Sequence, residues 1–276
     1  MPSNRRQFIQ RSLIGVAALA INGVVSGLAE SAPPARFKLG LGTYTFRLLD
    51  LKGLIERCKE LSLTTIELSH PQYMLPQAKL EEFPDVRERL ASGGVNLTSW
   101  FCGHLSKQAE IEALVEGVRR FGVKTVSGAA PREMLDDINT ACAKAGFAFG
   151  IHNHYFPDRK FIYESPEDVL SAVEGRPNLF ATLDTGHMIA VGVDPTEAYY
   201  KMKAHVRIIH IKDEDTPGHS VVLGKGKGNI GKFLQTIAGD SFQNLCAIEY
   251  EEGTDPKQEV SECIEYIRSQ VRLESQ

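Results

Sequence analysis

The chain has 276 residues, of which 42% are hydrophobic and 24% charged, as is typical of a globular protein. Its formal charge is −4, and it falls to −6 without residues 1–32, which carry three Arg and one Glu. An acidic chain without basic runs is unsuited to nucleic acid, so no such partner is expected.

The first 32 residues differ in character from the rest. Residues 4–8 read Asn-Arg-Arg-Gln-Phe, a twin-arginine pattern, and an apolar stretch over residues 13–28 follows. The stretch contains three glycines and an asparagine and is short for a membrane span. We therefore expect a twin-arginine signal and linker over residues 1–32, with cleavage near Ala29 and no stable membrane insertion afterwards. The remaining domain, residues 33–276, would then be periplasmic or otherwise exported; a retained anchor is the alternative.

From residue 37 onward, short apolar or β-branched runs alternate with amphipathic segments. Strands are predicted at residues 37–46, 63–68, 95–101, 123–127, 147–152, 179–184, 206–212 and 245–250. Helices are predicted at 51–61, 84–92, 106–122, 131–145 and 230–238, and three more begin at Ser165, Asp194 and Asp255. This α/β alternation predicts a single-domain (β/α)8 TIM barrel. An open doubly wound sheet would need a Gly-rich phosphate-binding turn after the first strand, and the chain has none there.

The five cysteines stand singly, at positions 58, 102, 142, 246 and 263. No pair has the spacing of a zinc finger or a CxxC motif. We expect buried, apolar thiols instead of a disulfide framework.

Four successive strands in the second half end in His, Asp or Glu. These residues are His152 with His154, then Asp184, His210 and Glu249. The C-terminal ends of barrel strands share one mouth, and the period of two places these side chains on the inner face. Because such groups are costly inside a barrel unless they bind something, we expect a divalent metal there.

Each of these residues also has a simpler interpretation. Asp184 can cap the segment after its strand, and His210 can be a core histidine. Glu249 can pair with Lys212, and His154 can be a solvated loop residue. The Gly-rich segment at residues 223–229 lacks the spacing of a phosphate-binding loop, so we expect a flexible loop at the mouth.

The motifs Asp184-Thr185-Gly186-His187 and His210-Ile211-Lys212-Asp213, with the late Glu249, resemble the xylose isomerase-like TIM-barrel family. This family includes sugar isomerases and epimerases, inosose dehydratases and endonuclease IV, and the resemblance covers nearly all of residues 37–275. It implies a divalent ion (Mn2+, Zn2+, Fe2+ or Co2+) held by His152, Asp184, His210 and Glu249. In the epimerases the ligand that ends strand five is a glutamate. This chain has His152 there, so it lacks one of the two carboxylate bases that the epimerases use.

The resemblance implies a sugar isomerase or epimerase that enolises a sugar or keto-sugar next to a carbonyl. Glu249 would be the general base, and His187, Lys212 or His154 the acid. The expected substrate contacts, including an aromatic ring for stacking, are Glu67, Trp100, His154, His187 and Lys212.

Two other functions remain open. A lyase or dehydratase acting on a keto-sugar or keto-glycoside needs only one base and one acid. This requirement agrees with His152 standing in place of the strand-five glutamate. A sugar-binding barrel without catalysis would be favoured if Glu249 paired with Lys212 instead of a metal. The DNA-repair relatives need three metals and extra histidines, which this chain lacks.

Overall fold

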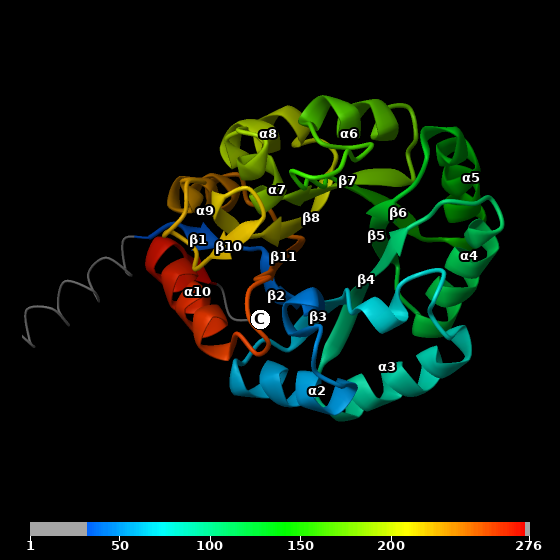
Figure 1. The fold of residues 1–276 in the computed structure, drawn as a ribbon, viewed down its shortest axis with the longest axis horizontal. Helices are drawn as coiled ribbons and strands as arrows, with labels where there is room; N and C mark the ends of the chain where they lie inside the picture. The colour runs from blue at the N-terminus through cyan, green and yellow to red at the C-terminus, as the bar shows by residue number, and fades with distance from the viewer. Residues whose placement is uncertain (1–31, 274–276) are drawn as a thin grey trace, which may run out of the picture.

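Eight parallel strands close into a barrel in the computed structural model, which describes residues 32–273 (Figure 1). The strands are β2 (Lys38–Gly42), β3 (Thr65–Leu68), β4 (Asn96–His104), β5 (Thr125–Ala129), β6 (Ala148–His152), β7 (Leu179–Asp184), β8 (Val206–Ile211) and β11 (Leu245–Ile248). Each strand pairs with the next along the chain, and β11 pairs with both β8 and β2 to close the ring. The predicted (β/α)8 barrel is confirmed.

Helices surround the barrel on its outer face (Figure 1). They are α2 (Leu51–Glu60), α3 (Phe83–Ser92), α4 (Glu110–Phe121), α5 (Leu135–Ala145), α6 (Pro166–Val173), α7 (Thr185–Ala190), α8 (Pro195–Met202), α9 (Ile230–Gly239) and α10 (Lys257–Gln270). Local sequence fixes several of their ends. Ser165 and Asp168 form a capping box at α6, and Asp194 accepts two backbone N–H bonds at α8. Gly122 and Gly146 adopt left-handed φ angles that end α4 and α5.

The buried apolar residues form two separate clusters. The larger one lies between the outer face of the barrel and the helices. The smaller one fills the inside of the barrel and consists of Ala148, Phe180, Ile208, Leu245 and Ala247. Because these residues lie one or more periods of two before His152, Asp184, His210 and Glu249, the same faces carry those polar groups to the C-terminal mouth.

Several elements depart from the expected pattern. Residues 43–46 form a short 3-10 helix instead of extending β2, and the unexpected α7 follows β7 directly. The loop after β8 contains a hairpin, β9 (Asp213–Thr216) with β10 (His219–Val221), turned at Gly218 with φ of +80°. At the other end of the barrel, β1 (Pro34–Ala35) pairs in parallel with β12 (Arg272–Leu273).

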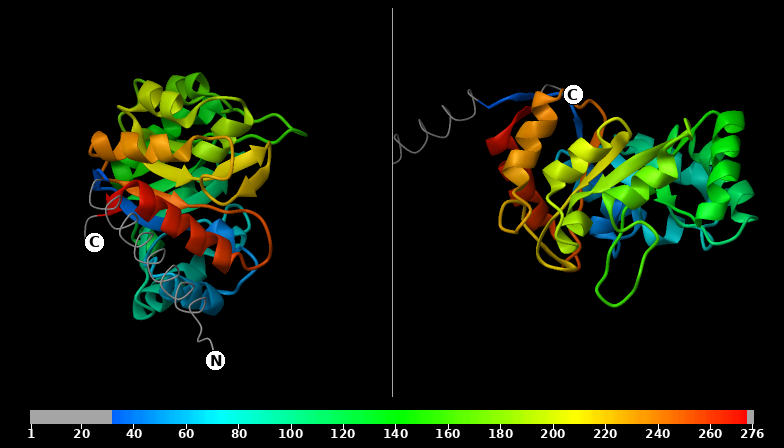
Figure 2. Two further views of the ribbon diagram at one scale, coloured as in Figure 1. Left: turned by 90° about the vertical axis from the view of Figure 1, so that its left-hand side faces the viewer. Right: turned by 90° about the horizontal axis from the view of Figure 1, so that it is seen from above.

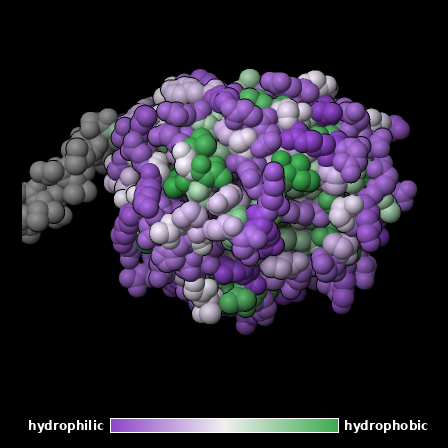
Figure 3. All heavy atoms as spheres, turned by 45° about the horizontal axis from the view of Figure 1, so that its top comes forward, coloured by the Kyte–Doolittle hydropathy of each residue, from purple (hydrophilic) through white to green (hydrophobic). Residues whose placement is uncertain are grey.

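The twin-arginine signal and linker are predicted at residues 1–32, of which residues 1–31 lie outside the described part of the chain. No helix within residues 32–273 is long and apolar enough to cross a membrane. All five cysteines are buried and unpaired, as expected. The visible surface of this part is mostly hydrophilic, with small separate apolar spots (Figure 3).

Candidate active site

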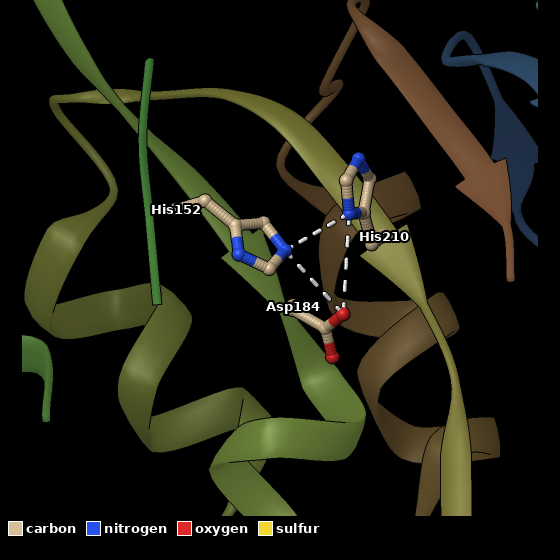
Figure 4. A group of neighbouring side chains, drawn as sticks. All are labelled: His152, Asp184 and His210. Carbon is tan, nitrogen blue, oxygen red and sulfur yellow. Dashed lines mark hydrogen bonds and ion pairs between the residues drawn. The ribbon is translucent and has the colours of Figure 1, made fainter. Parts of the chain in front are cut away.

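Three side chains from neighbouring strands converge on one point at the barrel mouth. His152 ends β6, Asp184 ends β7 and His210 lies near the end of β8 (Figure 4). His152 Nε2 lies 3.1 Å from His210 Nδ1 and 3.6 Å from Asp184 Oδ2, and His210 Nδ1 lies 3.9 Å from Asp184 Oδ2. One ligand atom from each residue lies within 4.8 Å of the others, so the three form a possible metal site. Two imidazole nitrogens and a carboxylate oxygen suit Zn2+ and the other expected divalent ions.

The two carboxylate oxygens of Asp184 have different roles: one caps a helix, and the other faces the site. Its Oδ1 accepts the backbone N–H of His187 and so caps α7, as the simpler interpretation proposed. Its Oδ2 is buried and has no hydrogen-bond partner. The Asn153 side chain holds the Asp184 backbone through two 2.9 Å hydrogen bonds. This buried oxygen faces two ring nitrogens and lies 3.2 Å from Lys212 Nζ, so it already has one cationic neighbour and is placed to coordinate a metal ion as well.

Glu67 orients the His210 ring by bonding to the ring nitrogen that faces away from the site. It lies on β3 and is fully buried, and its Oε2 bonds to His210 Nε2. Its Oε1 accepts hydrogen bonds from Ser99 at 2.8 Å and Ser127 at 2.6 Å. This contact leaves Nδ1 of His210 facing the site, as in carboxylate–histidine–metal arrangements. The expectation that Glu67 touches substrate does not fit the structure. Its carboxylate bonds to His210, Ser99 and Ser127, and Glu67 does not line the cavity.

Lys212 lies beneath the site and is 1% exposed. Its Nζ lies 2.5 Å from Glu251 Oε1, 3.2 Å from Asp184 Oδ2 and 3.9 Å from Glu249 Oε2. Burial opposes its charge, but these carboxylates together raise the pKa of Lys212 above its ordinary value. Lys212 does not line the cavity, so a direct substrate contact, as expected from the sequence, does not fit this position.

Glu251 is a site residue that the sequence interpretation missed. It follows Glu249 by two positions, and that period was the available signal. Its carboxylate lines the cavity and is held ionised by Lys212: although burial opposes the charge, Lys212 lowers the pKa of Glu251. Glu251 therefore takes the close ion pair with Lys212 that the simpler interpretation gave to Glu249.

Glu249 lies beside the three-residue cluster and faces the cavity. Its Oε2 is 3.6 Å from His210 Nδ1, and burial raises the pKa of its carboxyl to about 7. Gly42, at the end of β2, makes room for it, since a Cβ at that position would lie 2.9 Å from Glu249 Oε1. A carboxyl group with this pKa is suited to accept a proton near neutral pH.

The mouth opens into a cavity of about 600 Å³. His154 and His187 both line it, with ring centroids 4.2 Å apart. Burial and then Lys212 lower the pKa of His187 to about 3, and burial also lowers the pKa of His154, so both rings are neutral near pH 7. Apolar side chains from other strands and loops complete the wall, among them Met74, Leu75, Pro76, Phe101 and Phe156.

Trp100 does not line this cavity, so its expected stacking on a substrate ring does not fit the structure. It is fully buried outside the barrel, where its ring packs edge-on against Phe83 and its Nε1 donates to the Tyr73 carbonyl. Successive residues on a strand face opposite sides, so Ser99 and Phe101 point inward while Trp100 points outward. Trp100 therefore belongs to the hydrophobic core.

The Gly-rich loop is anchored instead of free, which corrects the expectation of a flexible mouth loop. Its backbone N–H groups at Gly224, Gly226 and Gly228 all donate to the buried Asp213 carboxylate, at 2.9–3.1 Å. A Cβ at Gly226 would overlap that carboxylate. The anion that this loop holds is therefore a side chain of the same chain.

The model of the family described as Xylose isomerase-like TIM barrel matches residues 55–270, and the chain belongs to this family. No curated protein matches the chain.

Solved structures with the same fold include enzymes that act on sugars. D-psicose 3-epimerase from Clostridium cellulolyticum H10, solved with D-tagatose, has a TM-score of 0.69 at 13% identity, over 86% of this chain and 100% of that one. The probable 3-DHS dehydratase AsbF from Bacillus anthracis has a TM-score of 0.66 at 17% identity, over 84% and 98%. The IolI protein with a bound zinc atom has a TM-score of 0.68 at 18% identity, over 84% and 98%. At these identities the likeness shows the shared fold.

Proposed function

We propose that the chain is a divalent-metal-dependent sugar isomerase or epimerase that acts next to a carbonyl of a sugar or keto-sugar. The observation that carries this proposal is the convergence of His152, Asp184 and His210 beside Glu249 at a cavity that His152, His210 and Glu249 line. The fold it shares with D-psicose 3-epimerase supports it. On the residue 4–8 pattern alone, we also propose that the enzyme is exported.

In this proposal His152, Asp184 and His210 hold the ion, with Glu249 beside them as the fourth expected ligand. The fit rests on Asp184 Oδ2, which has no hydrogen bond and pairs with Lys212 at 3.2 Å, and on the two ring nitrogens that face it. A bound divalent ion would polarise the substrate carbonyl and make the neighbouring C–H more acidic. Lys212 balances the negative charge of Asp184 and Glu251 from below.

Glu249 is the proton acceptor in this mechanism. Glu249 lines the cavity beside the three ligand residues, where a carboxylate can take a proton from the substrate and return it. His187 lines the cavity as a neutral imidazole, so its part is to donate a hydrogen bond to a substrate oxygen. Lys212 is buried, paired and stabilised in its charged form, so its role is electrostatic.

A lyase is the second candidate, and one observation favours it. His152 stands where the epimerase pattern has a second carboxylate base, and Glu251 is held ionised by Lys212 at 2.5 Å. Glu249 is then the one carboxylate free to accept a proton at the cavity floor among the described residues. A β-elimination from a keto-sugar needs one such base, whereas epimerisation through two opposed bases needs two.

The test combines metal content with proton exchange. Metal is measured by mass spectrometry on the full chain and on His152→Ala, with His219→Ala on the exposed β9–β10 hairpin as the matched control. Keto-sugars are then incubated in D2O with the full chain and with Glu249→Gln. We expect stoichiometric metal in the full chain and in His219→Ala but not in His152→Ala, and exchange that Glu249→Gln reduces at least about 100-fold.

The products separate the candidate functions. Deuterium incorporation with unchanged composition supports an isomerase or epimerase, while an unsaturated product supports the lyase. Absence of metal after expression with ample Mn2+ and Zn2+ would overturn both and favour a sugar-binding barrel.

A further inference from the structure

The loop between β6 and α6 places a positively charged side chain, that of Arg159, at the rim of the cavity. This loop, green in Figure 2, stands out from the end of the barrel where the mouth lies. Arg159 lies on it and lines the same cavity as His187 and Glu249. Among the residues that line this cavity, Arg159 is the one with a permanent positive charge.

Aromatic rings hold the Arg159 guanidinium, which lies 5.1 Å from the centre of the Phe156 ring and 5.4 Å from that of Phe161. Stacking of this kind orients a guanidinium without neutralising it. Its acidic neighbour, Asp158, is 4.0 Å away and 83% exposed, a weak pairing in water. The Arg159 side chain donates no hydrogen bond to any residue that the structure describes, so its donors are available to a ligand.

Charge is therefore separated along the cavity. Glu249 and Glu251 give the floor its acidic character, while the rim carries Arg159. A substrate whose carbonyl lies at the floor and whose anionic group lies at the rim matches this arrangement.

We propose that Arg159 is a specificity-determining residue that binds a carboxylate on the substrate, so that the preferred substrates are keto-sugars bearing an acid group. This inference rests on the proposed function, since it places the carbonyl at the metal site. A carboxylate fits better than a phosphate, because one guanidinium matches one negative charge and no second permanent cation lines the cavity.

The test measures binding apart from catalysis. Calorimetry on the full chain with Mn2+ compares methyl glucoside, its 6-carboxylate (methyl glucuronide) and its 6-phosphate. None of these has a free carbonyl, so none can be enolised. The variants are Arg159→Gln, Arg159→Lys and, as control, Arg132→Gln, which removes another exposed Arg stacked on a ring, that of Tyr163, but outside the cavity.

We expect the full chain and Arg132→Gln to bind the glucuronide about five- to tenfold more tightly than the glucoside. Arg159→Gln should lose this preference without changing glucoside affinity, and Arg159→Lys should retain part of it. Equal binding of glucuronide and glucoside by the full chain, a preference kept in Arg159→Gln, or a preference for the phosphate would each overturn the proposal.

The binding test of Arg159 and the exchange test of the proposed function can fail independently of each other. Keto-sugar exchange in D2O, together with equal binding of glucuronide and glucoside by the full chain, would leave the isomerase proposal standing and refute the Arg159 proposal. A glucuronide preference that the full chain shows and Arg159→Gln loses, without any exchange of keto-sugars, would support the role of Arg159 and count against the isomerase.

Discussion

At the scale of single residues, Glu67 has a role that can be measured. It joins β3 to His210 and is itself held by Ser99 and Ser127. We expect Glu67→Ala to lower divalent-metal affinity by about 10- to 100-fold, because His210 loses the partner that fixes its ring. Competition with a chromophoric chelator measures this affinity. Ser99→Ala is the control, since it keeps the Glu67–His210 contact; unchanged affinity in a folded Glu67→Ala would refute the role.

Lys212 allows a second prediction, about stability. Replacing it with Met leaves the buried Asp184 and the adjacent Glu251 without their cation. We expect Lys212→Met to lower the free energy of unfolding by about 3–5 kcal/mol, and Lys212→Met with Glu251→Met to recover part of the loss. Urea unfolding of the metal-free proteins measures both. If the double variant is no more stable than the single one, the ion pair is not the cause.

The sequence located the strand-end residues but not their partners. Asp184, His210 and His152 could be placed because polar residues at barrel strand ends share one mouth. The partner of His210 could not, because Glu67 is 143 positions away, and only closure of the barrel brings them together. Trp100 was misassigned although the period of two was available, since Ser99 and Phe101 on either side of it face inward.

At the scale of elements, the anchoring of the Gly-rich loop by Asp213 leads to a third prediction. The Asp213 carboxylate ties down the segment that runs through Gly224, Gly226 and Gly228. We expect Asp213→Asn to cost about 2–4 kcal/mol of unfolding free energy and to speed amide exchange over residues 222–229. Asp215→Asn, on the same hairpin but exposed, is the control. Equal exchange in both variants would contradict the anchoring role.

The elements that the sequence did not predict are short. Helix α7 has six residues, and no amphipathic period develops over that length. Its Gly186 is required by packing, since a Cβ there would lie 2.5 Å from Lys212 Cε. The long elements, in contrast, were recognised from their caps and their apolar stripes, which are local properties. Long-range packing decides the short ones, and a single sequence does not reveal it.

At the scale of the whole molecule, buried neutral histidines make stability depend on pH. The pKa of His187 is about 3 in the folded chain, lowered first by burial and then by Lys212, against about 6.5 when unfolded. Its contribution is therefore complete above pH 6.5 and is lost as the pH falls from 6.5 towards 3. At pH 5 the loss amounts to as much as about 2 kcal/mol for one such histidine.

Urea unfolding at pH 7.5 and pH 5 tests this dependence. We expect His187→Gln to lose less stability between the two values than the unchanged chain. Glu214, whose pKa burial raises to about 7, acts in the opposite direction but is common to both proteins. Equal losses would show that His187 is not the titrating group.

The pairing of β1 with β12 also bears on how the molecule can be handled. It brings residues 34–35 beside 272–273, at the end of the barrel away from the mouth (Figure 2). Joining these segments by a short linker should allow circular permutants that open at exposed loops elsewhere. For the same reason, coupling the protein to a solid support through these segments would leave the cavity facing the solution and accessible to substrate.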